Sequence, residues 1–269
     1  MISITCASLS GGQGKTTSAI FLGRALAALG HRVLLVDADP QASLTFWLGY
    51  KVNDDEPTLL EVIKGLIRAE EGIYRLPNDN LWLIPSDNAL ATAQDFLSSS
   101  GAGAAILQHR LKPIAELFTV CIIDAPPSRT QIFLTTIGAA NEVLIPAETT
   151  SKGLNSVIGT VQLIQQLQEV GMFTGAILGI VPFRDKWTGF NQAKQSKKAV
   201  EAMRRIAGDI PMLPSILESE QFKRAIDQGV KLSDLGYAKL EFPFENIISL
   251  LESRWPILKT QLIGSQPSV

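Results

Sequence analysis

A glycine-rich run near the start of the chain reads Ser8-Leu9-Ser10-Gly11-Gly12-Gln13-Gly14-Lys15-Thr16-Thr17. It follows an apolar stretch, Ile2 to Ala7, and precedes a helix-like stretch, Ser18 to Leu29. Glycines let backbone N–H groups converge on a triphosphate without interference from Cβ atoms. The strict pattern G-x-x-x-x-G-K-[ST] has glycine where this chain has Leu9, so the match is imperfect. The strand and helix on either side nevertheless favour a phosphate-binding loop over a purely structural one.

We expect this loop to bind ATP together with Mg²⁺. Lys15 can neutralise the β and γ oxygens of a triphosphate, and the hydroxyl of Thr16 can reach the metal. The nucleotide-binding residues expected from the run are Ser10, Gly11, Gly12, Gln13, Gly14, Lys15, Thr16 and Thr17.

Two further segments extend the pattern. Val33 to Gln41 is an apolar run that ends in Asp-Ala-Asp-Pro-Gln, and Cys121 to Ser128 is an apolar run that ends in Asp-Ala-Pro-Pro-Ser. With these motifs in this order, the chain resembles the deviant-Walker ATPases of the ParA and MinD type. The resemblance implies a P-loop NTPase fold, ATP hydrolysis and dimerisation around nucleotide.

The two apolar runs deliver three aspartates toward the expected site. By the same resemblance, Asp39 orients the attacking water, Asp37 supports the metal shell and Asp124 holds Mg²⁺ through a water ligand. The residues alone leave a second interpretation of Asp37 open, a helix cap for the segment that begins near Ser43. Pro40 disfavours the α conformation at the residue before it, which helps to hold Asp39 in an extended loop.

The chain departs from the family at one position. The family has a signature lysine before Gly-Gly, which crosses the dimer interface to the partner's nucleotide, and this chain has Ser10 there. A serine cannot bring a positive charge to a phosphate. Lys152 follows a predicted strand at the place where the family faces its partner subunit, so it is a candidate replacement with a catalytic role. An ordinary solvated lysine is the alternative.

The serine also resembles one branch of the family, the McdA proteins, which distribute carboxysomes over the bacterial nucleoid with a small adaptor, McdB. Plasmid or chromosome partition with a ParB-like adaptor remains the alternative.

Composition predicts an ordinary globular protein. The chain has 269 residues, of which 46% are hydrophobic and 19% charged, enough for one large α/β domain over residues 1–269. Cys6 and Cys121 both lie in predicted strands, which fits packing roles in a reducing compartment. The chain enters a strand at Ile2 and has no apolar run of 18 residues, so we expect a cytoplasmic, nucleoid-associated protein without a membrane anchor.

Short apolar runs alternate with longer amphipathic ones, a pattern typical of βαβ units. We therefore expect a doubly wound, mainly parallel sheet with helices on both faces. The expected strands are Ile2 to Ala7, Arg32 to Val36, Leu81 to Pro85, Val120 to Ile123, Glu142 to Pro146 and Ile177 to Val181. The expected helices are Thr16 to Leu29, Leu59 to Ile67, Ala104 to Leu117, Gly153 to Val170, Phe190 to Ile206, Glu220 to Gln228 and Glu245 to Leu262. Leu97 to Ala104 is expected to be a loop.

The net charge of −2 gives no overall attraction to nucleic acid, but basic residues cluster locally. Between Arg184 and Arg205 there are seven basic residues and two acidic ones. Doubling this patch in a nucleotide-dependent dimer would give salt-sensitive, sequence-independent binding to double-stranded DNA. The candidate DNA-binding residues are Arg184, Lys194, Lys197, Lys198, Arg204, Arg205, Lys223 and Arg224. A solvated helix face is the alternative. Trp187 and Phe190 lie near this patch, where stacking on a ligand is one interpretation, but for a duplex binder we expect them to be packing residues.

Other functional classes fit less well. A MinD-like membrane anchor needs a basic amphipathic C-terminal helix, whereas Arg254 to Gly264 contains a proline and only two basic residues. An iron-protein ATPase needs cluster-bridging cysteines outside strands. A binding module without hydrolysis is disfavoured by the retained lysine and aspartates, although Ser10 leaves it open. No room precedes the loop for a helix-turn-helix, so we do not expect operator recognition.

Overall fold

The computed structural model describes residues 1–77 and 80–259. In that part of the chain an eight-stranded sheet has the order β10-β7-β6-β1-β5-β2-β4-β3. Its strands are β1 Ile2–Cys6, β2 Val33–Asp37, β3 Tyr74–Arg75, β4 Leu81–Ile84, β5 Val120–Asp124, β6 Glu142–Glu148, β7 Ala176–Asp185 and β10 Ile216–Leu217. A separate hairpin is made by β8 Trp187–Thr188 and β9 Asn191–Gln192. All strand pairs of the large sheet are parallel except β3 with β4, which confirms the predicted fold class.

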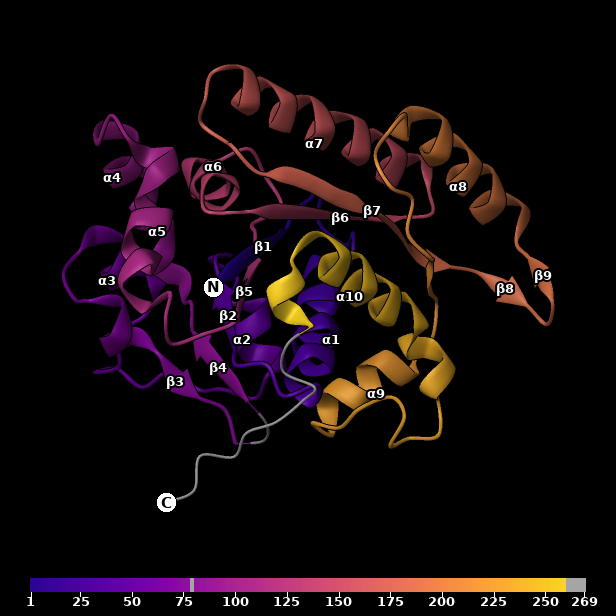
Figure 1. Cartoon of the computed structure of the whole chain (residues 1–269), viewed down its shortest axis with the longest axis horizontal. Coiled ribbons are helices and arrows are strands. Elements are labelled where there is room, and N and C mark those ends of the chain that lie inside the picture. Colours follow the sequence, from indigo (N-terminus) through magenta and orange to yellow (C-terminus); the bar gives the residue numbers. More distant parts are fainter. Residues whose placement is uncertain (78–79, 260–269) are drawn as a thin grey trace.

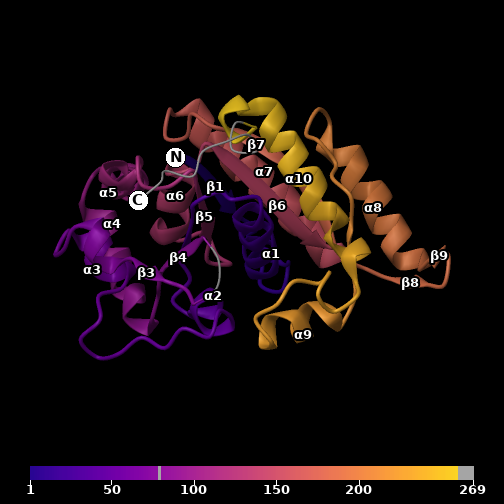
Figure 2. The same ribbon diagram turned by 60° about the horizontal axis from the view of Figure 1, so that its bottom comes forward.

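Helices cover both faces of the sheet (Figures 1 and 2). The α-helices are α1 Lys15–Ala28, α2 Ser43–Trp47, α3 Leu59–Lys64, α4 Ala93–Ser99, α5 Gly103–Leu111, α6 Gln131–Gly138, α7 Ser151–Glu169, α8 Lys194–Ala207, α9 Gln221–Asp227 and α10 Phe242–Arg254. Helices α1 and α10 pack together on one face. The other face carries α3 to α6 at one end of the sheet and α7 with α8 at the other (Figure 1).

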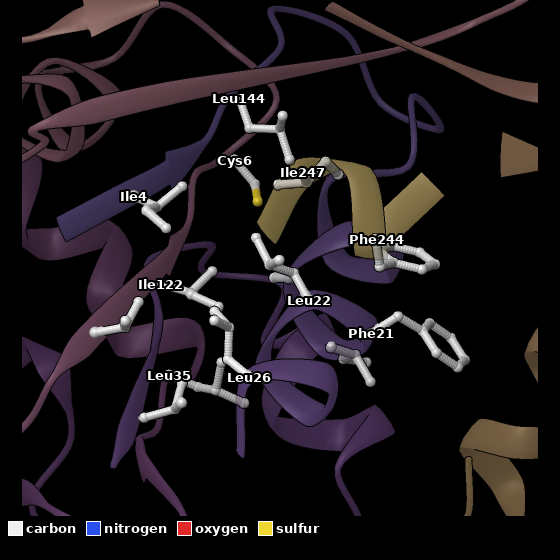
Figure 3. Close-up of a cluster of buried hydrophobic side chains, with 14 of the residues drawn as sticks. Ile4, Cys6, Phe21, Leu22, Leu26, Leu35, Ile122, Leu144, Phe244 and Ile247 are labelled. Carbon is white, nitrogen blue, oxygen red and sulfur yellow. The ribbon is translucent and has the colours of Figure 1, made fainter. Parts of the chain in front are cut away.

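The core between α1, α10 and the sheet is aliphatic with an aromatic corner (Figure 3). Phe244 stacks on Phe21 with ring centroids 5.7 Å apart, and Phe222 of α9 meets Phe21 edge to face at 5.1 Å. Cys6 points into this layer from β1, and it and Cys121 are buried free thiols, which confirms their expected packing roles. The corner ties α9 and α10 to α1, the helix that follows the glycine-rich run.

The register of the central strands determines where the motifs lie. In β1, β5 and β2, Cys6 pairs with Asp124 and Asp124 pairs with Asp37. Because the strands are parallel, the residues that follow them emerge at the same edge of the sheet, the usual position of a ligand site in doubly wound folds. The predicted meeting of the three motifs is therefore confirmed.

Some predicted elements were wrong. The predicted helix from Phe190 begins at Lys194, because Trp187 to Gln192 forms the β8–β9 hairpin around Gly189. The predicted loop from Leu97 is in part the end of α4. Helix α10 ends at Arg254, where Pro256 follows, and the predicted residues 260–262 lie outside the described part. Across the described residues, no helix is long and apolar enough to span a membrane.

We predict that replacing Phe244 by alanine lowers the free energy of unfolding by about 3–5 kcal/mol, because it empties a buried aromatic site. Phe244 is 1% exposed, whereas Phe242 on the same helix is 54% exposed. The control Phe242→Ala is expected to change stability by no more than about 0.5 kcal/mol. Chemical denaturation of both variants checks this, and equal losses would contradict the packing described.

Candidate nucleotide site

The glycine-rich run is a loop between β1 and α1. Gly12 has φ +81° and Gly14 has φ +93°, a region that L side chains rarely adopt. A Cβ atom on Gly14 would also lie 2.5 Å from the Phe183 ring at the end of β7. Both positions therefore need glycine for the backbone conformation, and Gly14 also needs it because a side chain there would clash with Phe183.

Leu9, which departs from the strict motif, fastens the loop to α7. Its N–H donates to Thr160 Oγ1 at 3.1 Å, and a Cβ at Gly159 would lie 3.5 Å from its Cδ1. The adjacent Ser8 hydroxyl hydrogen-bonds the Ser156 hydroxyl at 2.7 Å. Leu9 thus packs against Gly159 of α7. The glycine that the strict motif has at position 9 is therefore not required in this loop.

Two ammonium groups converge on the loop. Lys15 Nζ donates to the Ser10 carbonyl at 3.1 Å, and Lys152 Nζ, from the first turn of α7, donates to the Gly11 carbonyl at 3.1 Å. Burial lowers the pKa of Lys15, and the charge of Lys152 lowers it further, while Asp124 and Asp39 act against this. Two like charges beside a loop of this shape favour an anion between them.

A glutamine side chain couples the loop to the end of β6. Glu148 donates its N–H to Gln13 Oε1 at 2.9 Å, and Gln13 Nε2 donates to the Gly11 carbonyl at 3.3 Å. Because α7 begins at Ser151, just after Glu148, a shift of the loop would be passed directly to the start of this helix.

Asp124 lies at the end of β5 beside the loop and is 1% exposed. Its Oδ2 accepts a hydrogen bond from Thr16 Oγ1 at 2.6 Å, while its buried Oδ1 has no hydrogen-bond partner among the described residues. Burial, followed by the charge of Asp37, raises the pKa of Asp124 to about 8. A free carboxylate oxygen beside a threonine hydroxyl is a donor set that suits Mg²⁺, which prefers oxygen ligands.

The other two aspartates differ in their contacts. Asp37 is fully buried and accepts hydrogen bonds from the N–H and hydroxyl of Thr45, both at 2.8 Å, and from the N–H of Asp39. Its pKa is raised to about 6, mainly by burial. Asp37 thus anchors α2, as its cap interpretation required. Asp39 is half-buried, and among the described residues its carboxylate accepts a hydrogen bond only from the N–H of Gln41, at 2.9 Å.

Among the described residues no group of three histidine, cysteine, aspartate or glutamate side chains could hold a metal alone. Magnesium sites beside a nucleotide need only one or two protein ligands, because phosphate oxygens and water complete the coordination.

A cavity of about 690 Å³ continues from the loop past Thr17. Its walls include Phe46 and Trp47 of α2, Phe183, and the segment from Leu217 to Asp227. Arg184 also lines it, with φ +52°, an uncommon conformation for a residue other than glycine. This cavity could not be predicted from the sequence, because its walls come from segments far apart in the chain. The exposed aromatic pair in α2 was the available signal.

The predicted DNA-binding residues do not form one patch. Helix α8 presents five exposed basic side chains, Lys194, Lys197, Lys198, Arg204 and Arg205. Lys223 and Arg224 lie on α9, which is apart from α8 in both views (Figures 1 and 2). Arg184 pairs with Glu148 at 3.7 Å beside the cavity.

Comparisons with known proteins agree with this geometry. Residues 1–172 match the protein family described as AAA domain. The maintenance of carboxysome distribution protein A of Synechococcus elongatus is 57% identical over 93% of this chain and 99% of its own length. A solved ATP complex of a substituted McdA from Cyanothece has a TM-score of 0.91 and 52% identity, covering 93% of this chain and 96% of that one. The sporulation initiation inhibitor protein Soj of Bacillus subtilis is 32% identical over 65% of this chain and 70% of its own length.

We predict that Asp124→Asn makes the nucleotide-free protein progressively more stable than the wild type as the pH rises. The folded protein holds the Asp124 proton more tightly than the unfolded chain does, so this group's stabilisation is lost as the pH rises toward its folded pKa of about 8. Asparagine removes that loss.

Chemical denaturation at pH 6 and pH 8 is the measurement, with the exposed Asp95→Asn as the control. The difference between Asp124→Asn and wild type should grow by up to about 3 kcal/mol between the two pH values. A difference that stays the same would contradict the raised pKa that burial gives Asp124.

Proposed function

Because the chain belongs to the ParA-type ATPases of the AAA domain family, we propose that it forms an ATP-dependent dimer, binds DNA non-specifically, and positions a cargo over the nucleoid through partner-stimulated ATP hydrolysis. The proposed cargo is the carboxysome, since the relative that is 57% identical is named for carboxysome distribution. Plasmid or chromosome partition is the alternative.

The convergence of two ammonium groups on the phosphate loop carries this proposal. The ammonium groups of Lys15 and Lys152 donate hydrogen bonds to neighbouring carbonyls of the loop, at 3.1 Å each. A triphosphate would relieve their repulsion and accept hydrogen bonds from the loop N–H groups. Lys152 thereby supplies the charge that Ser10 cannot. It is exposed, so in a dimer it can also reach a phosphate held by the partner subunit.

The remaining polar groups of the site would have different roles in ATP hydrolysis. Thr16 and Asp124 would hold Mg²⁺, which would neutralise charge on the phosphate oxygens. Asp39 has one oxygen without a protein partner among the described contacts, so it is free to orient an attacking water. Asp37 keeps that loop in place through Thr45, and its support of the metal is indirect. The cavity beyond Thr17 has room for the base and ribose.

The exposed basic face of α8 supports DNA binding. In the described part of the chain, its five basic side chains form no ion pair with an acidic group, although Glu201 lies among them. One such face neutralises few phosphates, and two faces in a dimer neutralise twice as many. ATP-dependent dimerisation would therefore switch DNA binding on, and hydrolysis stimulated by an McdB-like or ParB-like adaptor would switch it off.

This cycle predicts opposite effects for two variants. Lys15→Ala should abolish nucleotide binding and with it DNA binding, because it removes the buried phosphate ligand. Asp39→Ala should bind ATP and remain on DNA at least tenfold longer than wild type, because loss of a group that orients or activates a reactant commonly slows the reaction by about 10²–10⁴. The measurement is the lifetime of the complex with random-sequence duplex after ATP is diluted away. If both variants bind DNA at wild-type strength regardless of nucleotide, the proposed nucleotide-dependent switch is wrong.

A third variant tests the replacement cation. We predict that Lys152→Ala weakens ATP-dependent dimerisation at least tenfold in sedimentation experiments, while the exposed Lys112→Ala has no effect. Lys152→Arg should recover much of the loss, since it keeps the charge. A normal dimer in Lys152→Ala would identify Lys152 as an ordinary surface lysine.

A further inference from the structure

The β8–β9 hairpin presents aromatic side chains away from the body of the protein. Trp187 pairs with Gln192 and Thr188 with Asn191, so Gly189 and Phe190 form a two-residue turn. Gly189 has φ +59°, the sign that a type II′ turn needs at its first central residue. Figures 1 and 2 both show the hairpin projecting from the end of β7 next to the start of α8.

The base of the hairpin is held firmly by one buried carboxylate. Asp185 is 2% exposed and accepts hydrogen bonds from Trp187 Nε1 at 3.1 Å and from Gln192 Nε2 at 2.9 Å, so it joins both strands. The N–H of Lys186 donates to Ser196 Oγ of α8 at 3.2 Å. The tip is therefore fixed relative to the basic face of α8.

The exposure of this tip contradicts the expected packing role. Phe190 is 99% exposed and Trp187 is 49% exposed. A fully solvated phenylalanine on a well-anchored turn contributes nothing to the stability of the fold, since no apolar surface of the ring is removed from water. Such a side chain is free to contribute its whole surface to a partner.

The surrounding charge selects the class of partner. Lys186 is paired with Glu218 at 3.3 Å, but Lys194, Lys197 and Lys198 on the adjoining turn of α8 are exposed and form no ion pair within the described chain. An aromatic tip beside unpaired lysines complements a polyanion that also offers flat apolar faces, and nucleic acid has both.

We propose that the β8–β9 hairpin is a wedge for duplex DNA. The α8 lysines contact phosphates, and Phe190 inserts between neighbouring base pairs, where stacking is tolerant of sequence. The narrow turn suits insertion, because a two-stranded ribbon fits a DNA groove. This inference rests on the DNA binding proposed above and adds to it a contact that does not depend on phosphate charge.

The experiment separates the wedge from the phosphate contacts. A random-sequence duplex carries 2-aminopurine, whose fluorescence rises when it is unstacked, and binding of the full chain with ATP is measured at several salt concentrations. Phe190→Ala should bind on the order of tenfold more weakly. It should keep the wild-type dependence of log affinity on log salt and lose the fluorescence rise. Lys197→Ala should instead lower the salt slope by about 1 and keep the rise.

Two further variants make the comparison specific. Phe190→Trp should restore both affinity and fluorescence, since it keeps a flat ring. Leu66→Ala, which alters another large side chain that is 70% exposed, should behave as wild type. The melting temperature of Phe190→Ala should equal that of wild type, because its ring contacts little of the fold.

The outcomes distinguish the two proposals. If wild type binds DNA with ATP but Phe190→Ala binds equally well and neither raises the fluorescence, the wedge is wrong and the DNA switch stands. If Phe190→Ala loses only stimulation by an adaptor protein, the hairpin is a protein-docking element and the wedge is also wrong. If wild type binds no DNA with ATP, the proposed DNA binding fails and the wedge fails with it.

Discussion

The attachment of the phosphate loop to the start of α7 is the constraint on which the site depends. Lys152 holds the Gly11 carbonyl, Gln13 holds the N–H of Glu148, and Leu9 is fixed by Thr160. These contacts couple the position of the loop to that of α7. An anion that draws Lys15 and Lys152 toward itself must therefore act on the helix as well, which gives nucleotide binding a route to the surface where a second subunit would dock.

A second constraint is the burial of carboxylates at the same edge. Parallel register brings Asp37 and Asp124 side by side in β2 and β5, where burial raises the pKa of both. The protein uses the two groups differently. The Asp37 carboxylate accepts hydrogen bonds from Thr45 and the backbone of Asp39, so it orders the loop. Asp124 has one buried oxygen with no partner in the described part of the chain. Burying two neighbouring carboxylates is electrostatically costly, so this edge of the sheet is suited to a ligand that brings a cation together with phosphates.

Much of the sheet could be predicted because its strands are short, continuous apolar runs that end in recognisable motifs. All six expected strands form, and the aspartates meet where parallel register requires. The β8–β9 hairpin could not be predicted from helical periodicity, since its geometry depends on the buried Asp185 that joins Trp187 and Gln192. The cavity past Thr17 was likewise beyond the sequence, because its walls come from β7, α2 and α9. The basic residues can be read from the sequence, but only the fold shows that those of α8 lie apart from those of α9.

Binding of the unmodified protein to a random-sequence duplex with ATP, with ADP and without nucleotide, at low and moderate salt, tests the central claim most directly. The loop, its two ammonium groups and the exposed face of α8 predict tight binding with ATP alone, weakening steeply as salt is raised. Equal binding in all three nucleotide states, or none in any, would contradict a nucleotide-controlled DNA switch.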